Sequence, residues 1–560
     1  MLARDRAIES LAAERFDVVV IGGGITGAGV ALDAATRGFS VALVEKADFA
    51  AGTSSRSSKL VHGGLRYLQN FDIGLVREAL LERRLLVKLA PHLVHPLPLV
   101  VPAFDGARRD LLVGIGLNMY DVMATPRLRR RPRSGRRAAA DPGLDGDSDW
   151  SPERHRMIPG EEVVKLLPAL ASREPSGGYL FYDCQTDDSR LVLTVLAEAE
   201  RFGAICANRL EVIELADADG WTAGVKVRDA ETEAEFVVAA DNVINATGVW
   251  ADRIRPEELH SEAEVPTIRP SRGTHITLSS TDLPLHAGAI VPAGEGRTIF
   301  ALPWLGRSLL GTTDNNYDGD IDHVRPSGED IEYLLDATNA FFDSSFGPGD
   351  LTGAYAGVRP LISTGDSRKS VDISRKAELY ETSSGLITIT GGKLTTFRRM
   401  AKMAVDRLVE RDGRVAPCRT HEIPLGQPVD PDLLLLVEGV DDESRAALAA
   451  RYGHLAERVL DTAAERGELA QRIVPELPDL LAEAPYAARH EQARTVGDVL
   501  LRRTRLGLLA ARSVAEPGAP AAERVARAMA AELGWDDARV AVELERFREE
   551  ALAEGLLVPE

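Results

Sequence analysis

Cysteine is scarce in this sequence of 560 residues, which contains only Cys184, Cys206 and Cys418. They are far apart and form no CxxC pair, so neither a disulfide framework nor a structural zinc site is expected, and we predict no other metal site. Free cysteines usually behave as small buried hydrophobic residues, which is the role we expect for these three. Their scarcity fits the reducing environment of the cytoplasm.

Long apolar runs and excess positive charge are also missing. No apolar run reaches the length of about 18 residues that a transmembrane helix requires, and Met1 to Glu14 carries charges throughout, unlike a secretory signal. The formal net charge is -20 at pH 7, which argues against broad nucleic-acid binding. We therefore expect a cytoplasmic protein that can contact a membrane only peripherally.

The first pattern that is present is typical of a βαβ unit. Phe16 to Ile21 and Ser40 to Glu45 are short apolar runs that resemble buried parallel strands, and Ala28 to Arg37 between them has helical composition. The motif Gly22-x-Gly24-x-x-Gly27 lies between the first strand and the helix. These glycines permit a tight turn, close approach of a pyrophosphate and close helix–strand packing.

Glu45 completes the pattern, because a carboxylate at the end of the second strand can bind ribose hydroxyls. The strands, the helix, the glycines and the acid together predict a dinucleotide site. Asn245-Ala246-Thr247-Gly248 and Gly391-Gly392-Lys393 are further glycine motifs, and each follows an apolar run far along the chain. One cofactor held by such distant segments favours an extended FAD.

The length predicts two or three domains. Helical patterns cover Ile73 to Leu89 and Asp188 to Phe202, while Ala204 to Ala246 indicates strands. Short alternating segments with Gly and Pro turns, from about Pro266 to Thr313, indicate an antiparallel sheet. After about Pro417 the composition shifts to Ala, Leu, Glu and Arg, which predicts a separate helical domain.

Four motifs make the sequence recognisable. Gly52 to Leu68 reads GTSSRSSKLVHGGLRYL, and Gly311 to Asp314, Gly357 to Pro360 and Gly391 to Phe397 read GTTD, GVRP and GGKLTTF. With the N-terminal glycine motif, they closely resemble the FAD-dependent, quinone-linked glycerol-3-phosphate dehydrogenases. The resemblance runs in order from about Phe16 to Glu410 and is highly specific.

The resemblance implies an α/β (overall α+β) fold with an FAD domain of the glutathione-reductase/amino-acid-oxidase type, an antiparallel substrate domain and a helical C-terminal domain. The predicted oxidoreductase region is 1–415, with FAD-binding parts at about 16–90, 186–250 and 352–410. The substrate parts lie at about 91–185 and 251–351, and the helical domain at 416–560. The implied reaction is oxidation of sn-glycerol 3-phosphate to dihydroxyacetone phosphate, with electrons passing from FAD to a quinone.

A phosphorylated substrate requires cations even in an acidic chain, and the planar fork of Arg suits phosphate oxygens. The candidates are Arg66, Arg359, Arg375 and Lys393. By resemblance, Arg66 and Arg359 contact substrate phosphate or hydroxyls, and Lys393 lies beside the flavin. Arg375 has less distinctive surroundings.

The proton acceptor has more than one candidate. His275 begins a predicted strand, and a histidine can act as a base near pH 7. His62 lies within the first motif, where it can instead hold the loop around the flavin, and Tyr67 is a candidate for a hydrogen bond to the substrate. The predicted cofactor contacts are Gly22, Gly23, Gly24, Ile25, Thr26, Gly27, Glu45, Lys46, Thr53, Ser54, Ser57, Ser58, His62, Gly63, Gly64, Leu65, Thr247, Gly248, Trp250, Gly392, Lys393, Leu394 and Thr395.

The sequence leaves membrane attachment, oligomeric state and several alternative functions open. Pro126 to Arg137 contains seven arginines and has no counterpart in the family pattern; it is either a solvated loop or a segment that attracts anionic lipid headgroups, with the apolar stretch His92 to Phe104 nearby. Family members imply peripheral attachment to the inner face of the cytoplasmic membrane and a possible homodimer. An oxidase that uses O2, an amino-acid or amine oxidase, and a non-catalytic flavin-binding protein are the alternatives.

Overall fold

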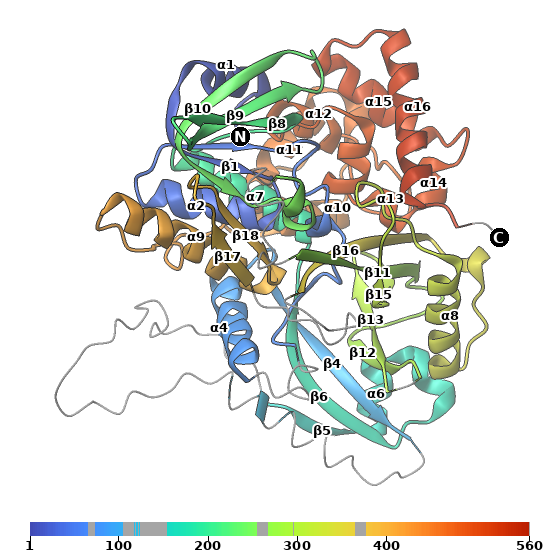
Figure 1. Ribbon diagram of the computed structural model, residues 1–560. Helices are drawn as coiled ribbons and strands as arrows, with labels where there is room; N and C mark the ends of the chain where they lie inside the picture. The colour runs from blue at the N-terminus through green and yellow to red at the C-terminus, as the bar shows by residue number, and fades with distance from the viewer. Residues whose placement is uncertain are drawn as a thin grey trace, which may run out of the picture.

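The structure is a computed structural model, and it describes residues 1–64, 73–104, 117, 119–120, 123, 154–254, 267–294, 296–363 and 377–558. Within these residues the chain forms two large sheets and a group of C-terminal helices (Figure 1). The α/β fold class is confirmed. The region of the arginine-rich segment 126–137 lies outside the described residues.

The first sheet is mainly parallel and has the order β17-β18-β10-β1-β2-β7, with the β8–β9 hairpin joined to β10. β1 pairs in parallel with both β2 and β10, and α2 connects β1 to β2, so the predicted βαβ unit is confirmed. The strands are β1 (Arg15–Ile21), β2 (Val41–Val44), β7 (Ile205–Ala207), β8 (Leu210–Ala218), β9 (Trp221–Asp229), β10 (Glu235–Asn245), β17 (Ala377–Glu381) and β18 (Ile387–Gly391).

Alternate side chains of β1 point to opposite faces of the first sheet and pack in two different hydrophobic clusters. Val18 and Val20 pack with the helices on one face, and Val19 and Ile21 pack with α1 and the β8–β9 hairpin on the other. Because both faces are covered, the four residues Val18 to Ile21 form a continuous apolar run, as expected for a buried parallel strand. The helices around this sheet are α1 (Arg4–Ala13), α2 (Ile25–Thr36), α4 (Ile73–Leu89), α7 (Asp188–Arg201) and α9 (Phe397–Asp412).

The second sheet is largely antiparallel and has the order β15-β11-β14-β13-β12-β4-β6-β3, with β16 paired to β11 and β5 to β6. The predicted antiparallel region is therefore confirmed. Its strands are β3 (Leu60–Val61), β4 (His95–Ala103), β5 (Arg156–Pro159), β6 (Gly177–Gln185), β11 (Thr267–Ser279), β12 (Gly288–Pro292), β13 (Thr298–Trp304), β14 (Arg307–Gly311), β15 (Asn315–Asn316) and β16 (Gly353–Ser363).

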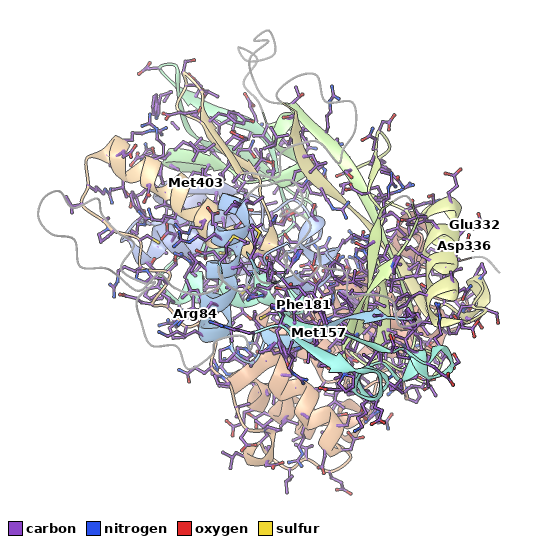
Figure 2. The ribbon with its side chains drawn as sticks, turned by 90° about the horizontal axis from the view of Figure 1, so that it is seen from below. Arg84, Met157, Phe181, Glu332, Asp336 and Met403 are labelled. Carbon is purple, nitrogen blue, oxygen red and sulfur yellow. The ribbon has the colours of Figure 1, made fainter. Side chains whose placement is uncertain are left out.

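Helices α6 (Gly160–Leu166) and α8 (Gly328–Phe342) cover the outer side of the second sheet. Figure 2 shows Glu332 and Asp336 of α8 pointing outward, whereas Phe181 of β6 lies inside. β4 corresponds to the apolar stretch that we considered for lipid contact. Its Leu97 and Leu99 are buried in the core, so they are not available to a membrane.

The C-terminal part is helical, as predicted, and includes one π-helical segment, Asp498–Arg503. Its core is continuous with the second sheet, because Trp304 and Tyr355 belong to the same cluster of buried residues as the C-terminal helices. The helices are α10 (Asp442–Tyr452), α11 (Ala456–Glu465), α12 (Glu483–His490), α13 (Leu506–Leu509), α14 (Ala511–Ala515), α15 (Pro520–Leu533) and α16 (Asp537–Glu554).

Candidate active site

The turn between β1 and α2 has the shape of a pyrophosphate cradle. Gly22 has a φ of +110°, which disfavours other residues, and a Cβ on Gly27 would lie 1.9 Å from the carbonyl oxygen of Gly22. Ile25 and Thr26 form the first turn of α2, whose N-terminus carries a partial positive charge. The Ser54 hydroxyl accepts a 2.9 Å hydrogen bond from the amide of Ile25, which brings the serine-rich loop to this helix end.

Glu45 lies beside this turn, at the end of β2. Its carboxylate accepts hydrogen bonds from the amides of Gly23 (2.7 Å) and Ala47 (2.8 Å). Burial raises its pKa above the ordinary range, although the two amides act in the opposite direction. The carboxylate is thus held against the β1–α2 turn by two backbone amides.

The motif Gly391 to Phe397, which begins at the end of β18 in the first sheet, contacts the motif Gly52 to Leu68 near His62. Gly392 has a φ of +68°, and Lys393 and Leu394 lead into a short 3-10 turn before α9. The Thr395 hydroxyl accepts from the amide of His62 (3.2 Å) and lies 3.3 Å from its carbonyl oxygen. Sequence segments more than 300 residues apart are therefore joined at this place.

Other predicted cofactor contacts lie around the same region. Thr53 donates to the carbonyl of Val358 (2.6 Å), and Gly63 donates from its amide to Tyr120 (2.9 Å). Gly64 has a positive φ. Four further predicted contacts make hydrogen bonds or ion pairs of their own. Gly248 accepts from Thr390 and Thr247 donates to Asn245. Lys46 and Trp250 both contact Asp322.

His275 is enclosed where the two sheets meet. Its ring stacks on Tyr355 of β16 with 4.8 Å between ring centroids, and its Nε2 lies 2.9 Å from the Ser58 hydroxyl. A Cβ on Gly311 would come within 2.2 Å of the ring, so glycine is required beneath it. Burial, with Lys59 and Arg359 nearby, holds the pKa of His275 well below its ordinary value. The imidazole is therefore neutral and can accept a proton at neutral pH.

Arg359 reaches back along the strand pair toward His275. Its Nη2 donates to the Thr312 hydroxyl (3.1 Å) and to the carbonyl of Thr313 (3.3 Å), and its Nη1 lies 3.5 Å from Asp314. A Cβ on Gly273, two residues before His275, would lie 2.5 Å from Nη2. A partly exposed guanidinium and a neutral imidazole are thus brought together on neighbouring strands.

Several predicted site residues fall outside the described chain: Leu65, Arg66, Tyr67 and Arg375. Sequence reasoning missed Tyr355 and Thr312, and it considered Ser57 and Ser58 only as cofactor contacts. In the structure Ser57 donates to Asp188 (2.7 Å) and Ser58 contacts His275. The GTTD motif contains Thr312, so the motif was the available signal for that residue.

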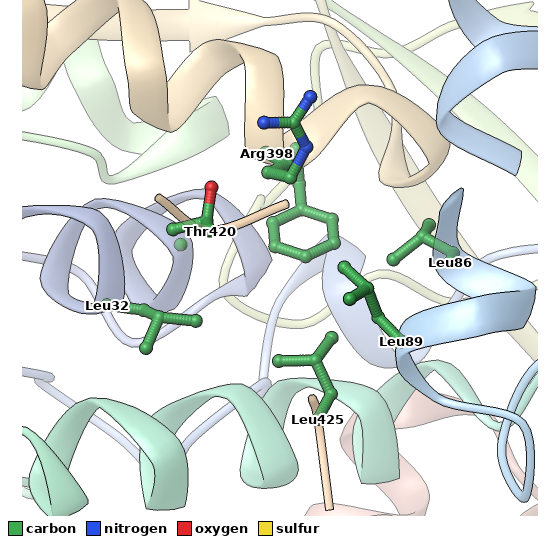
Figure 3. Close-up of a pocket in the computed structure, with 8 residues that line it drawn as sticks. Leu32, Leu86, Leu89, Arg398, Thr420 and Leu425 are labelled. Carbon is green, nitrogen blue, oxygen red and sulfur yellow. The ribbon is translucent and has the colours of Figure 1, made fainter. Parts of the chain in front are cut away.

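A small apolar cavity lies away from these residues, between α2, α4 and α9 (Figure 3). Its volume is about 10 Å³, which is close to the minimum for one water molecule. Leu32, Leu89 and Leu425 are among the residues that line it. It is a packing void in the core between these helices.

Comparisons with known proteins agree with this geometry. The family model "FAD dependent oxidoreductase" matches residues 17–407, and the model "C-terminal domain of alpha-glycerophosphate oxidase" matches residues 387–540. A mitochondrial glycerol-3-phosphate dehydrogenase of Arabidopsis thaliana is 37% identical over 97% of this chain and 87% of its own length. The aerobic glycerol-3-phosphate dehydrogenase of Bacillus subtilis is 35% identical over 90% and 89%.

The chain belongs to the FAD-dependent glycerol-3-phosphate dehydrogenase family.

A solved structure supports the same assignment for the fold of this enzyme. The glycerol-3-phosphate dehydrogenase from Bacillus halodurans, complexed with FAD, is 28% identical, with a TM-score of 0.76 over 100% of this chain and 98% of that one. The cradle described above fits FAD, because glycines leave space at the turn, the α2 N-terminus suits phosphates, and Glu45 suits a ribose. No helix in the described parts of the chain combines the length and the apolar character needed to cross a bilayer.

Proposed function

We propose that this enzyme oxidises sn-glycerol 3-phosphate to dihydroxyacetone phosphate. The observation that supports this most strongly is that Arg359 of β16 lies near His275 of the paired strand β11, which would offer a phosphate-binding cation close to a neutral base. FAD, when bound, supplies the acceptor for the hydride on C2. The division into FAD-binding and substrate parts that the sequence predicts remains part of this proposal.

The two residues have separate tasks in the proposed reaction. Arg359 binds phosphate oxygens through its planar fork and so fixes the position of C2. His275 takes the proton from the C2 hydroxyl. Its Nδ1 is buried and has no hydrogen-bond partner among the described residues, while Nε2 contacts Ser58. We assign the proton on the neutral ring to Nε2, where it donates to Ser58, and this leaves Nδ1 as the acceptor.

The remaining predicted residues complete the proposal. Lys393 supports negative charge that develops near the flavin, and Arg66, Tyr67 and Arg375 contribute further substrate contacts. The other predicted cofactor residues contact FAD. We also retain a peripheral position at the inner face of the cytoplasmic membrane, a homodimer and a quinone as electron acceptor as proposals.

The substrate is tested by anaerobic reduction of the purified enzyme. Addition of sn-glycerol 3-phosphate is expected to bleach the visible flavin band, whereas glycerol without phosphate leaves it unchanged at the same concentration. No bleaching by the phosphate ester would contradict the substrate. An amino acid that bleaches the band instead would support an amino-acid oxidase.

The acceptor is tested by reoxidation of the substrate-reduced enzyme. Fast reoxidation by a short-chain quinone and slow reoxidation by air are expected for a quinone-linked dehydrogenase. The reverse order would identify an oxidase that uses O2. Sedimentation with vesicles at low and high salt tests the membrane proposal, which fails if the enzyme never binds them.

A further inference from the structure

The C-terminal segment Arg505–Ala511 contacts the strands that carry His275 and Tyr355. The Thr277 hydroxyl of β11 donates to the carbonyl of Leu508 (3.1 Å), and the amide of Ala511 donates to the carbonyl of Thr352 (2.8 Å). A Cβ on Gly353 would lie 2.3 Å from the carbonyl oxygen of Leu508, so the two segments approach closely. Thr277 is two residues from His275 on the same strand, and Gly353 is two residues from Tyr355.

Arg505 extends this contact into the serine-rich loop. Its guanidinium is fully buried and donates to the carbonyl of Ser55 (2.6 Å) and to Asp188 (3.0 Å). Its backbone has a φ of +68°, a left-handed conformation that costs a residue other than glycine free energy. Its Nη1 donates to the carbonyl of Leu501 within the C-terminal domain (2.8 Å), while Nη2 makes the two bonds outside it.

Asp188 connects Arg505 to the loop itself. Its fully buried carboxylate accepts from the Lys59 ammonium (2.8 Å), from the Ser57 hydroxyl (2.7 Å) and from the Ser57 amide (3.0 Å). The next residue, Ser58, bonds His275. The Tyr355 hydroxyl, whose ring stacks on His275, donates to the carbonyl of Ser57 (2.9 Å). The loop is thus held between the charge cluster and the imidazole.

From these contacts we propose that Arg505 is a positioning residue: the C-terminal domain holds the loop from Ser55 to Ser58, and through Ser58 it orients His275 and keeps water away from it. The proposal rests on the proposed role of His275 as proton acceptor. The proposal gives the C-terminal domain a part in catalysis through its contact with the loop.

The charges around His275 determine what a loosened loop would do. Within the described chain, Lys59, Arg359 and Tyr355 face the imidazole, and Asp188 and Arg505 lie behind Lys59. Burial is the largest cause of the low pKa of His275. Burial and Arg505 also lower the pKa of Lys59 to about 7. A substitution that keeps the charge but loosens the loop would admit water, and the pKa of His275 would rise toward its ordinary value.

The test compares Arg505→Lys with Arg451→Lys. Both keep a positive charge at a buried site, but Arg451 pairs with Asp479 and Glu483 inside the C-terminal domain. For Arg505→Lys we expect kcat to fall about 10- to 100-fold and the acid limb of the kcat profile to move to higher pH. Hydrogen exchange of the peptide that covers 52–61 should become faster. Arg451→Lys should lower the melting temperature but leave the acid limb of the kcat profile and the hydrogen exchange of 52–61 as in the wild type.

A double-mutant cycle with Ser58→Ala shows whether Arg505 acts through the loop. Ser58→Ala alone should move the acid limb in the same direction, and adding Arg505→Lys should reduce kcat by much less than it does in the wild type. Fully additive losses, or a lower melting temperature with an unchanged pH profile and unchanged exchange in 52–61, would overturn the proposal.

Thr277→Val provides the answer if Arg505→Lys does not fold. It removes the hydroxyl that bonds Leu508 and also contacts Gly353 and Thr352, without changing a buried charge, and we expect a smaller shift of the acid limb in the same direction. An unshifted limb in Thr277→Val would then overturn the proposal. His275→Asn separates the two hypotheses: if its acid limb is that of the wild type, the proposed base is wrong, whatever Arg505 does.

Discussion

At the scale of single residues, the environment of His275 explains how a histidine can remain a base below its ordinary pKa. Desolvation disfavours the imidazolium, and the positive charges of Lys59 and Arg359 act in the same direction. The same burial limits movement of the ring. Tyr355 stacks on one face of the imidazole, and the ring packs so closely on Gly311 that a Cβ at that position would not fit. Burial of the imidazole therefore both fixes its position and lowers its pKa.

This environment predicts the pH dependence of catalysis. Because the folded-state pKa of His275 is lowered, the ring stays neutral as the pH falls through 6.5, and the acid limb of kcat should lie below that value. His275→Asn should lose this limb and about 10²- to 10⁴-fold in rate. His323→Asn is the control, because His323 contacts Glu554 rather than the proposed base or its neighbours. A wild-type limb above pH 6.5 would contradict the prediction.

Arg359 gives a second prediction at this scale. Arg359→Lys keeps the charge but removes the planar fork, so kcat/KM should fall by a factor that corresponds to about 1.5–3 kcal/mol. Steady-state kinetics at varied substrate concentration measure the change, which should appear mainly in KM. Arg228→Lys, at an exposed position in the first sheet, is the control. An unaltered KM in Arg359→Lys would exclude phosphate binding by this side chain.

At the scale of elements, the β1–α2 turn depends on individual glycines. In Gly27→Ala the new Cβ would meet the backbone oxygen of Gly22 at 1.9 Å, and backbone cannot move aside cheaply. We expect loss of bound FAD and a lower melting temperature, measured by flavin absorbance and calorimetry. Gly74→Ala is the control, since its Cβ would meet nothing within 4 Å near the start of α4. It should stabilise the protein by about 0.4–1 kcal/mol.

The elements differ in how well their sequence predicts them. The βαβ unit, α4 and α7 follow from local apolar patterns, and the structure confirms them. β4 did not follow, because Pro96, Pro98 and Pro102 argue against an internal strand. The three prolines lie an even number of residues apart, so their missing donors face the same side of the strand, and β4 still pairs with β6 from His95 to Ala103.

In the candidate site, too, some residues could be predicted from the sequence and others could not. Arg359 was found through its motif and His275 as a histidine at the start of a predicted strand, and the register of β11 and β16 then places their strands together. The roles of Ser57 and Ser58 were not predictable, because their partners Asp188 and His275 are 131 and 217 residues away. Such distant pairs leave no periodicity in the sequence.

At the scale of the whole molecule, buried ion pairs connect the C-terminal helices to the first sheet. Arg503 donates to both oxygens of Asp48, and all of these atoms belong to fully buried side chains. Removal of one partner of a buried pair leaves an uncompensated charge. Arg502 also donates to Asp48 (2.6 Å) and remains in Arg503→Met, so this substitution should reduce the free energy of unfolding by at most about 3–5 kcal/mol.

Chemical denaturation of the FAD-loaded enzyme measures this loss. Arg527→Ala is the control, because its ion pair with Glu523 is exposed, and pairs of that kind contribute about 0–1 kcal/mol. If the two variants are equally stable, the connection between the C-terminal helices and the first sheet does not depend on this pair.

The left-handed Arg505 also has a consequence for how the enzyme is made. It bonds Ser55, which lies 450 residues earlier in the chain. Ribosomes add about 5–20 residues per second, and domains fold from the N-terminus as they emerge. The cradle around Gly22 can therefore form long before Arg505 has been synthesised, whereas the loop that orients His275 is complete only afterwards. A chain released after α9 but before Arg505 would contain the glycine motifs and lack the contact that holds this loop, so an oriented base would be formed only once Arg505 has been made.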